Sequence, residues 1–191
     1  MQVGVLALQG DFAKHAHVLK HLDCHVVEVR TPRDLEICQG IIIPGGESTT
    51  ILKQMDFIGL KQPLIDFAKT KPLFGTCAGL ILMSKGIVPS KMEGLQILDI
   101  TVERNAYGRQ IASFEATVNL DLKENKCFPA VFIRAPRILS ISPTVQVLGT
   151  FEGEPILIRQ GHHLGATFHP ELIPDCPVVH RYFLEMIKKM V

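Results

Sequence analysis

The sequence lacks an excess of charge of either sign. It has 20 Lys and Arg against 19 Asp and Glu among 191 residues, so its formal net charge is +1 with histidine neutral. Proteins that bind nucleic acid carry a basic field, and interaction tails carry runs of like charge. Neither feature occurs in this sequence, and we therefore predict that the chain does not bind nucleic acid.

The sequence also lacks any pair of cysteines with C-x-x-C spacing. A secreted disulfide framework has an even number of closely spaced cysteines, and a structural zinc site uses C-x-x-C pairs. We exclude both classes and expect a reduced, cytoplasmic setting. The five cysteines are odd in number and scattered: Cys24, Cys38, Cys77, Cys127 and Cys176.

No leader or membrane segment is recognisable at the N-terminus. The opening residues, MQVGVLALQGD, have no basic lead-in, and their apolar run ends at Gln9 after only a strand's length. A membrane-spanning helix needs about 20 apolar residues, and a signal peptide begins with basic ones. We expect no contact with a membrane. Linkers, repeats and low-complexity stretches are absent too, so we expect residues 1–191 to form one domain.

What the sequence does contain is apolar material, at 47% of its residues, and a regular alternation of elements in its first half. Strands that alternate with helices build a parallel sheet with right-handed crossovers. Later segments are strand-like and joined by short turns, which favours antiparallel additions. We predict an α/β fold, a single three-layer domain whose mixed, mainly parallel central sheet is flanked by helices. The predicted strands are 3–8, 25–29, 40–44, 71–75, 95–105, 112–120, 130–136, 145–151, 155–160 and one from 163, and the predicted helices are 12–22, 49–55, 63–69, 77–85 and 177–191.

A tight turn surrounds Cys77 in the stretch PLFGTCAGLILM. Small residues are needed beside the apex of a strand-to-helix turn, where a nucleophile projects in strained geometry. The apex also lies at a helix N-terminus, which favours a thiolate, and the Ala78 amide would face a developing oxyanion. The alternative for this segment alone is a buried core cysteine.

A base for this thiol is offered near the other end of the chain, by FHPEL. His169 and Glu171 are two residues apart, so on an extended segment both side chains project from the same side. Pro170 ends the strand and holds the pair at the edge of the sheet. A thiolate needs a base, and the base needs a group that fixes its tautomer. The three residues therefore suggest a catalytic triad, whereas a lone histidine would more simply be structural.

A third motif, IIIPGGESTT, ends a predicted strand in Pro-Gly-Gly, a turn whose amides can approach a ligand closely. It has no G-K-[ST], and the sequence has no G-x-G-x-x-G, so both nucleotide-binding motifs are excluded. Taken alone, this segment could be a plain loop.

Together PGGEST, FGTCAGL and FHPEL, in this order, resemble the signatures of class I, triad-type glutamine amidotransferases. The longer stretches GVLALQGDFAKH, VERNAYGRQ, SFEA and VFIRAP resemble the family of glutaminase subunits of the two-component pyridoxal 5′-phosphate synthase, over nearly the whole chain. The resemblance implies that Cys77 attacks the side-chain amide of L-glutamine to form a glutamyl thioester that water hydrolyses. It implies that His169 passes the proton to ammonia and that Glu171 orients His169.

The resemblance also implies where the substrate binds and where the ammonia goes. Ammonia would pass to a (β/α)8-barrel synthase subunit in a hetero-oligomer that makes pyridoxal phosphate, vitamin B6, with no cofactor or metal on the glutaminase. The Gly45-Gly46 peptide would act as a switch, with Gln9 and Gly10 beside it. The implied oxyanion donors are the amides of Gly46 and Ala78, and the implied glutamine-binding residues are Gly46, Glu47, Ser48, Arg104, Ile133 and Arg134.

Other functions and sites stay open at this point. The chain could serve another class I amidotransferase, for histidine, tryptophan or nucleotide synthesis, or be a non-catalytic binding module of the same fold. His17 and His21 have helical i,i+4 spacing that could chelate a metal, although surface histidines are commoner. His162 and His163 are adjacent, so on a strand they would point to opposite faces and make a poor metal pair.

Overall fold

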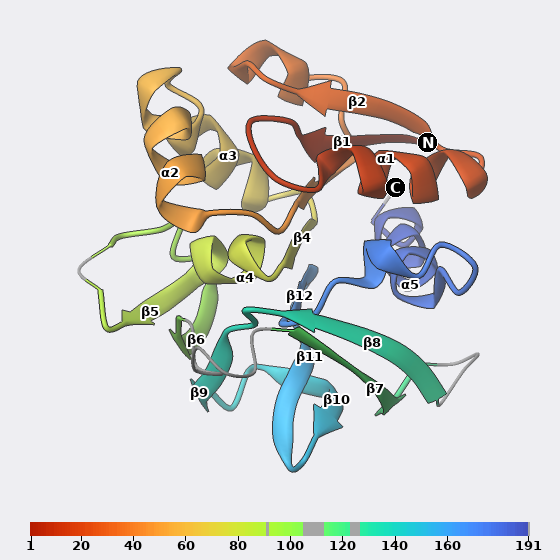
Figure 1. The fold of residues 1–191 in the computed structure, drawn as a ribbon. Coiled ribbons are helices and arrows are strands. Elements are labelled where there is room, and N and C mark those ends of the chain that lie inside the picture. The colour runs from red at the N-terminus through yellow and green to blue at the C-terminus, as the bar shows by residue number, and fades with distance from the viewer. Residues whose placement is uncertain (91, 105–112, 123–126, 191) are drawn as a thin grey trace.

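A large sheet crosses the molecule in this computed structural model, which describes residues 1–90, 92–104, 113–122 and 127–190. Its first five strands are mutually parallel, and from β12 onward each neighbouring pair is antiparallel. Among the described residues the strand order is β2 (His25–Val29), β1 (Gln2–Leu6), β3 (Gly40–Ile43), β4 (Leu73–Thr76), β12 (His163–Ala166), β11 (Glu154–Gln160), β10 (Gln146–Phe151), β7 (Ser113–Leu120) and β8 (Cys127–Ile133) (Figure 1). The predicted mixed sheet is confirmed.

Helices cover both faces of the parallel half of the sheet. Strand residues alternate between the two faces, so Ile41 and Ile43 of β3 join one hydrophobic cluster and Ile42 joins the other. The cluster around Ile41 includes side chains of α2 (Ser48–Phe57), α3 (Lys61–Ala68) and α4 (Ala78–Met83). The cluster around Ile42 includes α1 (Phe12–His21) and α5 (Val178–Lys188), which lie one above the other in Figure 1. The predicted three-layer arrangement is confirmed.

A second, smaller sheet was not expected. It consists of β5 (Ser84–Val88), β6 (Leu98–Glu103) and β9 (Arg137–Ile141). The predicted helix 77–85 is wrong at its end, because the chain turns into β5 after Met83. The Ser84 hydroxyl donates to the Leu80 carbonyl over 2.7 Å while its backbone is already extended, and this ends α4.

The other helical segments keep within a few residues of their predicted bounds. Two short 3-10 helices complete the described elements, η1 (Pro32–Leu35) and η2 (Pro170–Leu172). Over the described residues, no helix is both long and apolar enough to cross a membrane. The carboxyl ends of β1, β3, β4 and β12 meet at one edge of the sheet, where ligand sites of parallel sheets form.

Candidate active site

Cys77 occupies the turn between β4 and α4 in a strained conformation. Its φ of 47° and ψ of −102° are rare for a residue with a side chain. A Cβ on Gly79 would lie 2.0 Å from the Ile43 carbonyl oxygen, and one on Gly75 would lie 2.6 Å from the Gly79 backbone. The helix can pack this closely on the strands only because both residues are glycine. The geometry is that of a nucleophile elbow, so Cys77 is no ordinary core cysteine.

His169 follows β12, and its imidazole is tied to Glu171. The Nδ1 atom of His169 lies 2.7 Å from Oε1 of Glu171, and both side chains are almost fully buried. The predicted pairing is present, but its geometric reason was wrong. The two residues are held together by the turn of η2, which starts at Pro170, and not by an extended segment.

Both members of this pair have strongly shifted pKa values. Burial alone would lower the pKa of His169, but the nearby Cys77 sulfur and the hydrogen-bonded Glu171 carboxylate outweigh burial and raise that pKa to about 10. Burial raises the pKa of Glu171, but its interactions with the neighbouring imidazoles of His15 and His169 outweigh burial and lower it to about 2. At neutral pH the pair is therefore an imidazolium and a carboxylate.

The contact between the thiol and the imidazole is loose. Within the part of the chain that the structure describes, Nε2 of His169 closes no hydrogen bond, although the sulfur is near enough to influence the pKa of the ring. The Cys77 thiol donates weakly to the Ile133 carbonyl oxygen over 3.7 Å. Catalytic hydrogen bonds are often long until a substrate is bound, so this geometry fits a site in its resting state.

The Pro-Gly-Gly loop packs directly on the imidazole. A Cβ on Gly45 would lie 2.4 Å from Cε1 of His169. The Asp11 amide donates to the Gly45 carbonyl oxygen over 3.1 Å, and the Glu47 amide donates to the Gln9 side chain over 2.7 Å. The segment around Gln9 thus lies beside the loop, as predicted, and the bond to Asp11 fixes the orientation of the Gly45-Gly46 peptide.

Glu47 and Arg104 form an ion pair at the mouth of the site. Arg104 Nη2 lies 3.1 Å from Glu47 Oε1, so this arginine is not a solvated strand-edge residue. Glu47 also caps α2, where its carboxylate accepts hydrogen bonds from Thr49 and Thr50. Partial burial opposes ionisation, but these hydrogen bonds lower the pKa of Glu47 to about 2.

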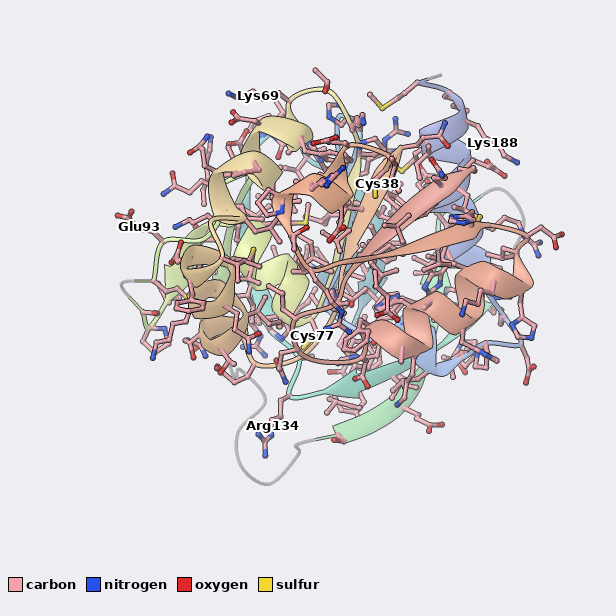
Figure 2. All side chains as sticks on the ribbon, turned by 90° about the horizontal axis from the view of Figure 1, so that it is seen from above. Cys38, Lys69, Cys77, Glu93, Arg134 and Lys188 are labelled. Carbon is pink, nitrogen blue, oxygen red and sulfur yellow. The ribbon has the colours of Figure 1, made fainter. Side chains whose placement is uncertain are left out.

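The predicted site residues meet around one cavity of about 530 Å³. Glu171 lies behind His169, and the buried Ala78 lies behind Cys77 at the first position of α4, so neither lines the cavity. Figure 2 shows Cys77 in the interior and Arg134 at the periphery, with its side chain turned outward. The lining is Gln9, Asp11, Gly46, Glu47, Ser48, Cys77, Ile81, Arg104, Ser113, Ile133, Arg134 and His169.

This arrangement suits a small, doubly charged molecule with an electrophilic carbon. The volume falls in the range of small-molecule sites, and the mouth offers a carboxylate and a guanidinium. The interior offers a cysteine sulfur beside an imidazolium, which together can carry out acyl transfer once the cysteine is a thiolate. Part of the VERNAYGRQ motif, residues 105–110, lies outside the described residues.

The histidine pairs offer no comparable arrangement for a metal. His21 Nδ1 already contacts the His17 carbonyl oxygen at 2.9 Å. The expectation that His162 and His163 point to opposite faces was wrong, because His162 lies in the turn before β12 and the two ring centroids are 4.1 Å apart. Their ring nitrogens are engaged elsewhere, with the Ala68 carbonyl oxygen and the Leu73 amide.

Two fully buried histidines beside the triad, His15 and His180, were missed by the sequence analysis. Their signal was available, because each falls on the apolar face of its helix. His15 is buried with Ala16, Val18 and Leu19 in α1, and His180 is buried among the apolar residues of α5.

Comparisons with known proteins agree with the motifs. The model of the SNO glutamine amidotransferase family matches residues 5–189. Two similar curated proteins are named pyridoxal 5′-phosphate synthase subunit PdxT. The one from Thermotoga maritima is 44% identical over 98% of this chain and 100% of its own length. The one from Koribacter versatilis is 48% identical over 98% and 96%.

Solved structures give the same result. One crystal structure, described as a glutamine amidotransferase, has a TM-score of 0.92 and 44% identity over 97% of this chain and 98% of its own. A putative GMP synthase component from Thermoplasma acidophilum has a TM-score of 0.71 at 12% identity over 99% and 94%. The second likeness concerns the fold alone.

Proposed function

Because this chain belongs to the SNO glutamine amidotransferase family, we propose that Cys77, His169 and Glu171 are the triad with which it hydrolyses L-glutamine. The chain is the glutaminase subunit of a pyridoxal 5′-phosphate synthase, as its motifs predicted. The observation that carries the triad is the joint position of a strained Cys77 and a Glu171-bound His169 at one cavity.

The proposed reaction has two halves. Cys77 reacts as the thiolate, with its proton held by His169; the sulfur attacks the side-chain amide carbon, the carbon–nitrogen bond breaks, and the His169 imidazolium gives its proton to the leaving ammonia. His169, now neutral, takes a proton from water as the water attacks the thioester, and glutamate leaves. Glu171 keeps the imidazole in one tautomer and stabilises its charged form. The Ala78 amide, at the first position of α4, and the Gly46 amide would stabilise the oxyanion.

Substrate recognition would use the charges at the mouth of the cavity. An amino acid carries an α-carboxylate and an α-ammonium, which match the guanidinium of Arg104 and the carboxylate of Glu47. Since these two side chains pair with each other, binding of glutamine would exchange one ion pair for two. Gly46, Ser48, Ile133 and Arg134, which also line the cavity, complete the proposed glutamine site.

The competing functions lose support. A non-catalytic module would not need the strain at Cys77 or the buried His169–Glu171 pair. The relatives that are 44–48% identical to this chain are named as subunits of pyridoxal 5′-phosphate synthase and not of another class I amidotransferase. We further propose that residues 1–191 form one domain, since the family model spans residues 5–189. The cytoplasmic setting stays a prediction, and all five cysteines are free thiols.

The partner is the part of the proposal that needs a direct experiment. We expect the purified chain to release ammonia from glutamine slowly, and addition of a (β/α)8-barrel synthase subunit to speed release about tenfold or more. Such a gain is expected when a competent state populated at a few per cent becomes the main one. Ammonia is measured with and without the synthase subunit, and the synthase by itself is the control. Equal rates would contradict activation by the partner, and no release in the mixture would contradict the glutaminase function.

Glu171→Gln should damage catalysis less than loss of the nucleophile. The amide oxygen still accepts from Nδ1–H, so the tautomer survives, but the negative charge that raises the pKa of His169 is gone. We expect a loss of kcat roughly a hundredfold smaller than that caused by removal of Cys77. The alkaline limb of the pH profile should move to lower pH. Glu28→Gln, which removes an exposed carboxylate paired with Arg30, is the control. An undiminished rate would place the orienting group elsewhere.

A further inference from the structure

His15 is a fully buried titratable residue that the proposed mechanism does not use. It lies on the inner face of α1, and its contacts come from three other elements. Its Nδ1 lies 2.9 Å from Nε2 of His180 in α5. Its Nε2 lies 3.1 Å from Oγ1 of Thr76, the residue before the nucleophile, and 3.3 Å from Oε2 of Glu171.

The positions of the protons in this cluster follow from which atoms have partners. Nδ1 of His180 is buried without a partner among the described residues. An orphaned N–H donor would cost more than an orphaned lone pair, so we place the His180 proton on Nε2. His180 then donates to Nδ1 of His15, which forces the His15 proton onto Nε2. That N–H points at Thr76 and at the Glu171 carboxylate.

His15 approaches the Glu171 carboxylate at Oε2, the oxygen that does not bind His169. Oε1 of Glu171 accepts from His169, whereas Oε2 is buried and closes no hydrogen bond within the described part of the chain. Nε2–H of His15 lies 3.3 Å from this oxygen. A buried carboxylate oxygen with one weak donor is sensitive to the loss of that donor.

We propose that His15 is a positioning residue of this active site, a neutral donor that holds Glu171 at Oε2 while His169 binds Oε1. The inference rests on the proposed glutaminase function. His180 sets the tautomer of His15, and Thr76 links the same ring to the strand that ends at the nucleophile. These contacts thus hold both Glu171 and the residue before Cys77 in position from the helical layer formed by α1 and α5.

The charges around His15 are compatible with a neutral ring. The groups that face it are Asp11, His169, Glu171 and His180. Burial is the largest influence and lowers the pKa of His15, although Glu171 acts in the opposite sense. Burial also lowers the pKa of His180 to about 3. The carboxylate therefore has a single imidazolium partner, His169, and His15 does not compete for that role.

The test compares His15→Leu with His15→Gln in the complex with the synthase subunit. Leucine removes the donor, and glutamine restores an N–H at a similar reach. We expect His15→Leu to lower kcat about tenfold with KM changed less than about twofold, because only orientation of the base is lost. The alkaline limb of its pH profile should fall by about one pH unit, since the His169–Glu171 pair is weakened. His15→Gln should recover most of both losses.

The matched control is His163→Leu, which removes another buried imidazole, one that contacts the Leu73 amide, the His162 ring and the Ala68 backbone. It should lower thermal stability without moving the pH profile. A His15→Leu enzyme with the wild-type profile, or a glutamine variant no better than leucine, would overturn the inference. If His15→Leu fails to fold, His180→Leu decides, because it leaves His15 in place without its donor. A wild-type profile there would equally overturn it.

A second readout does not need activity. NMR titration of the histidines in the isolated chain should give a lower pKa for His169 in His15→Leu than in the wild type, and an unchanged value would contradict the inference. Failure of the function is distinguishable from failure of the inference. An inactive wild-type complex overturns both, whereas an active wild type with unaltered variants overturns only the role of His15.

Discussion

Cys77→Ala abolishes glutamine hydrolysis in the complex with the synthase subunit, with an expected loss of at least about 10⁴-fold. The sulfur is the atom that forms the thioester, and no other described side chain at the cavity is a thiol. Alanine fits the elbow, because it is smaller than cysteine and adds no contact with Gly75 or Gly79. The variant should therefore fold and bind its partner. Ammonia release and co-purification with the synthase subunit measure the two properties separately.

Cys38→Ala is the matched control for this variant, since Cys38 is also a buried, free thiol. Burial raises the pKa of Cys38 to about 11, and its thiol donates to the Asp34 carbonyl oxygen over 3.1 Å. It is thus a poor nucleophile at neutral pH. An electrophilic glutamine analogue should label Cys77 and spare Cys38, Cys127 and the others, as read by peptide mass spectrometry. Equal labelling of all five cysteines, or appreciable turnover by Cys77→Ala, would contradict the mechanism.

The parts of the fold that follow from the sequence are those whose signals are local. The apolar run at residues 40–44 and the glycines around Cys77 define a strand and a turn without help from distant residues. β5 could not be found in this way, because Ser84 to Val88 is short, contains Lys85 and Gly86, and shows no apolar alternation of its own. What ends α4 is one side-chain hydrogen bond of Ser84, and what makes β5 a strand is pairing with β6, a later segment.

In the candidate site, too, the residues with local sequence signals were predicted and those that depend on distant contacts were not. Cys77, His169 and Glu171 were predicted because each lies in a motif with its own chemistry. The buried histidines that contact these residues were not predicted, because His15 and His180 are 165 residues apart. They come into contact only when α1 and α5 cover the same face of the sheet. The burial of a histidine on an apolar helix face can be predicted from the sequence, but the residue that it contacts depends on the tertiary structure. The ion pair between Glu47 and Arg104, 57 residues apart, could not be anticipated for the same reason.

His169→Asn should be as damaging as removal of the nucleophile, with a loss of at least about 10⁴-fold in kcat. The asparagine amide can still donate to Glu171, so the loop geometry should survive, but it cannot hold a proton for the leaving ammonia. The reaction would have to expel amide anion, which no described group at the cavity can protonate in its place. His162→Asn is the control, because that ring contacts the Ala68 carbonyl oxygen and lies outside the cavity lining.

The raised pKa of His169 should also make the stability of the folded chain depend on pH. The pKa of His169 is raised to about 10 in the folded state from 6.5, so its pairing stabilises the fold fully below about 6.5. This stabilisation is lost as the pH rises toward 10, and His169→Asn should flatten that part of the curve in chemical denaturation.

Because thiol and imidazole act as one unit, Cys77→Ala combined with His169→Asn should be no slower than either variant alone. A double variant in which the two losses multiply would mean that the sulfur and the imidazole serve separate steps, and the triad would have to be abandoned.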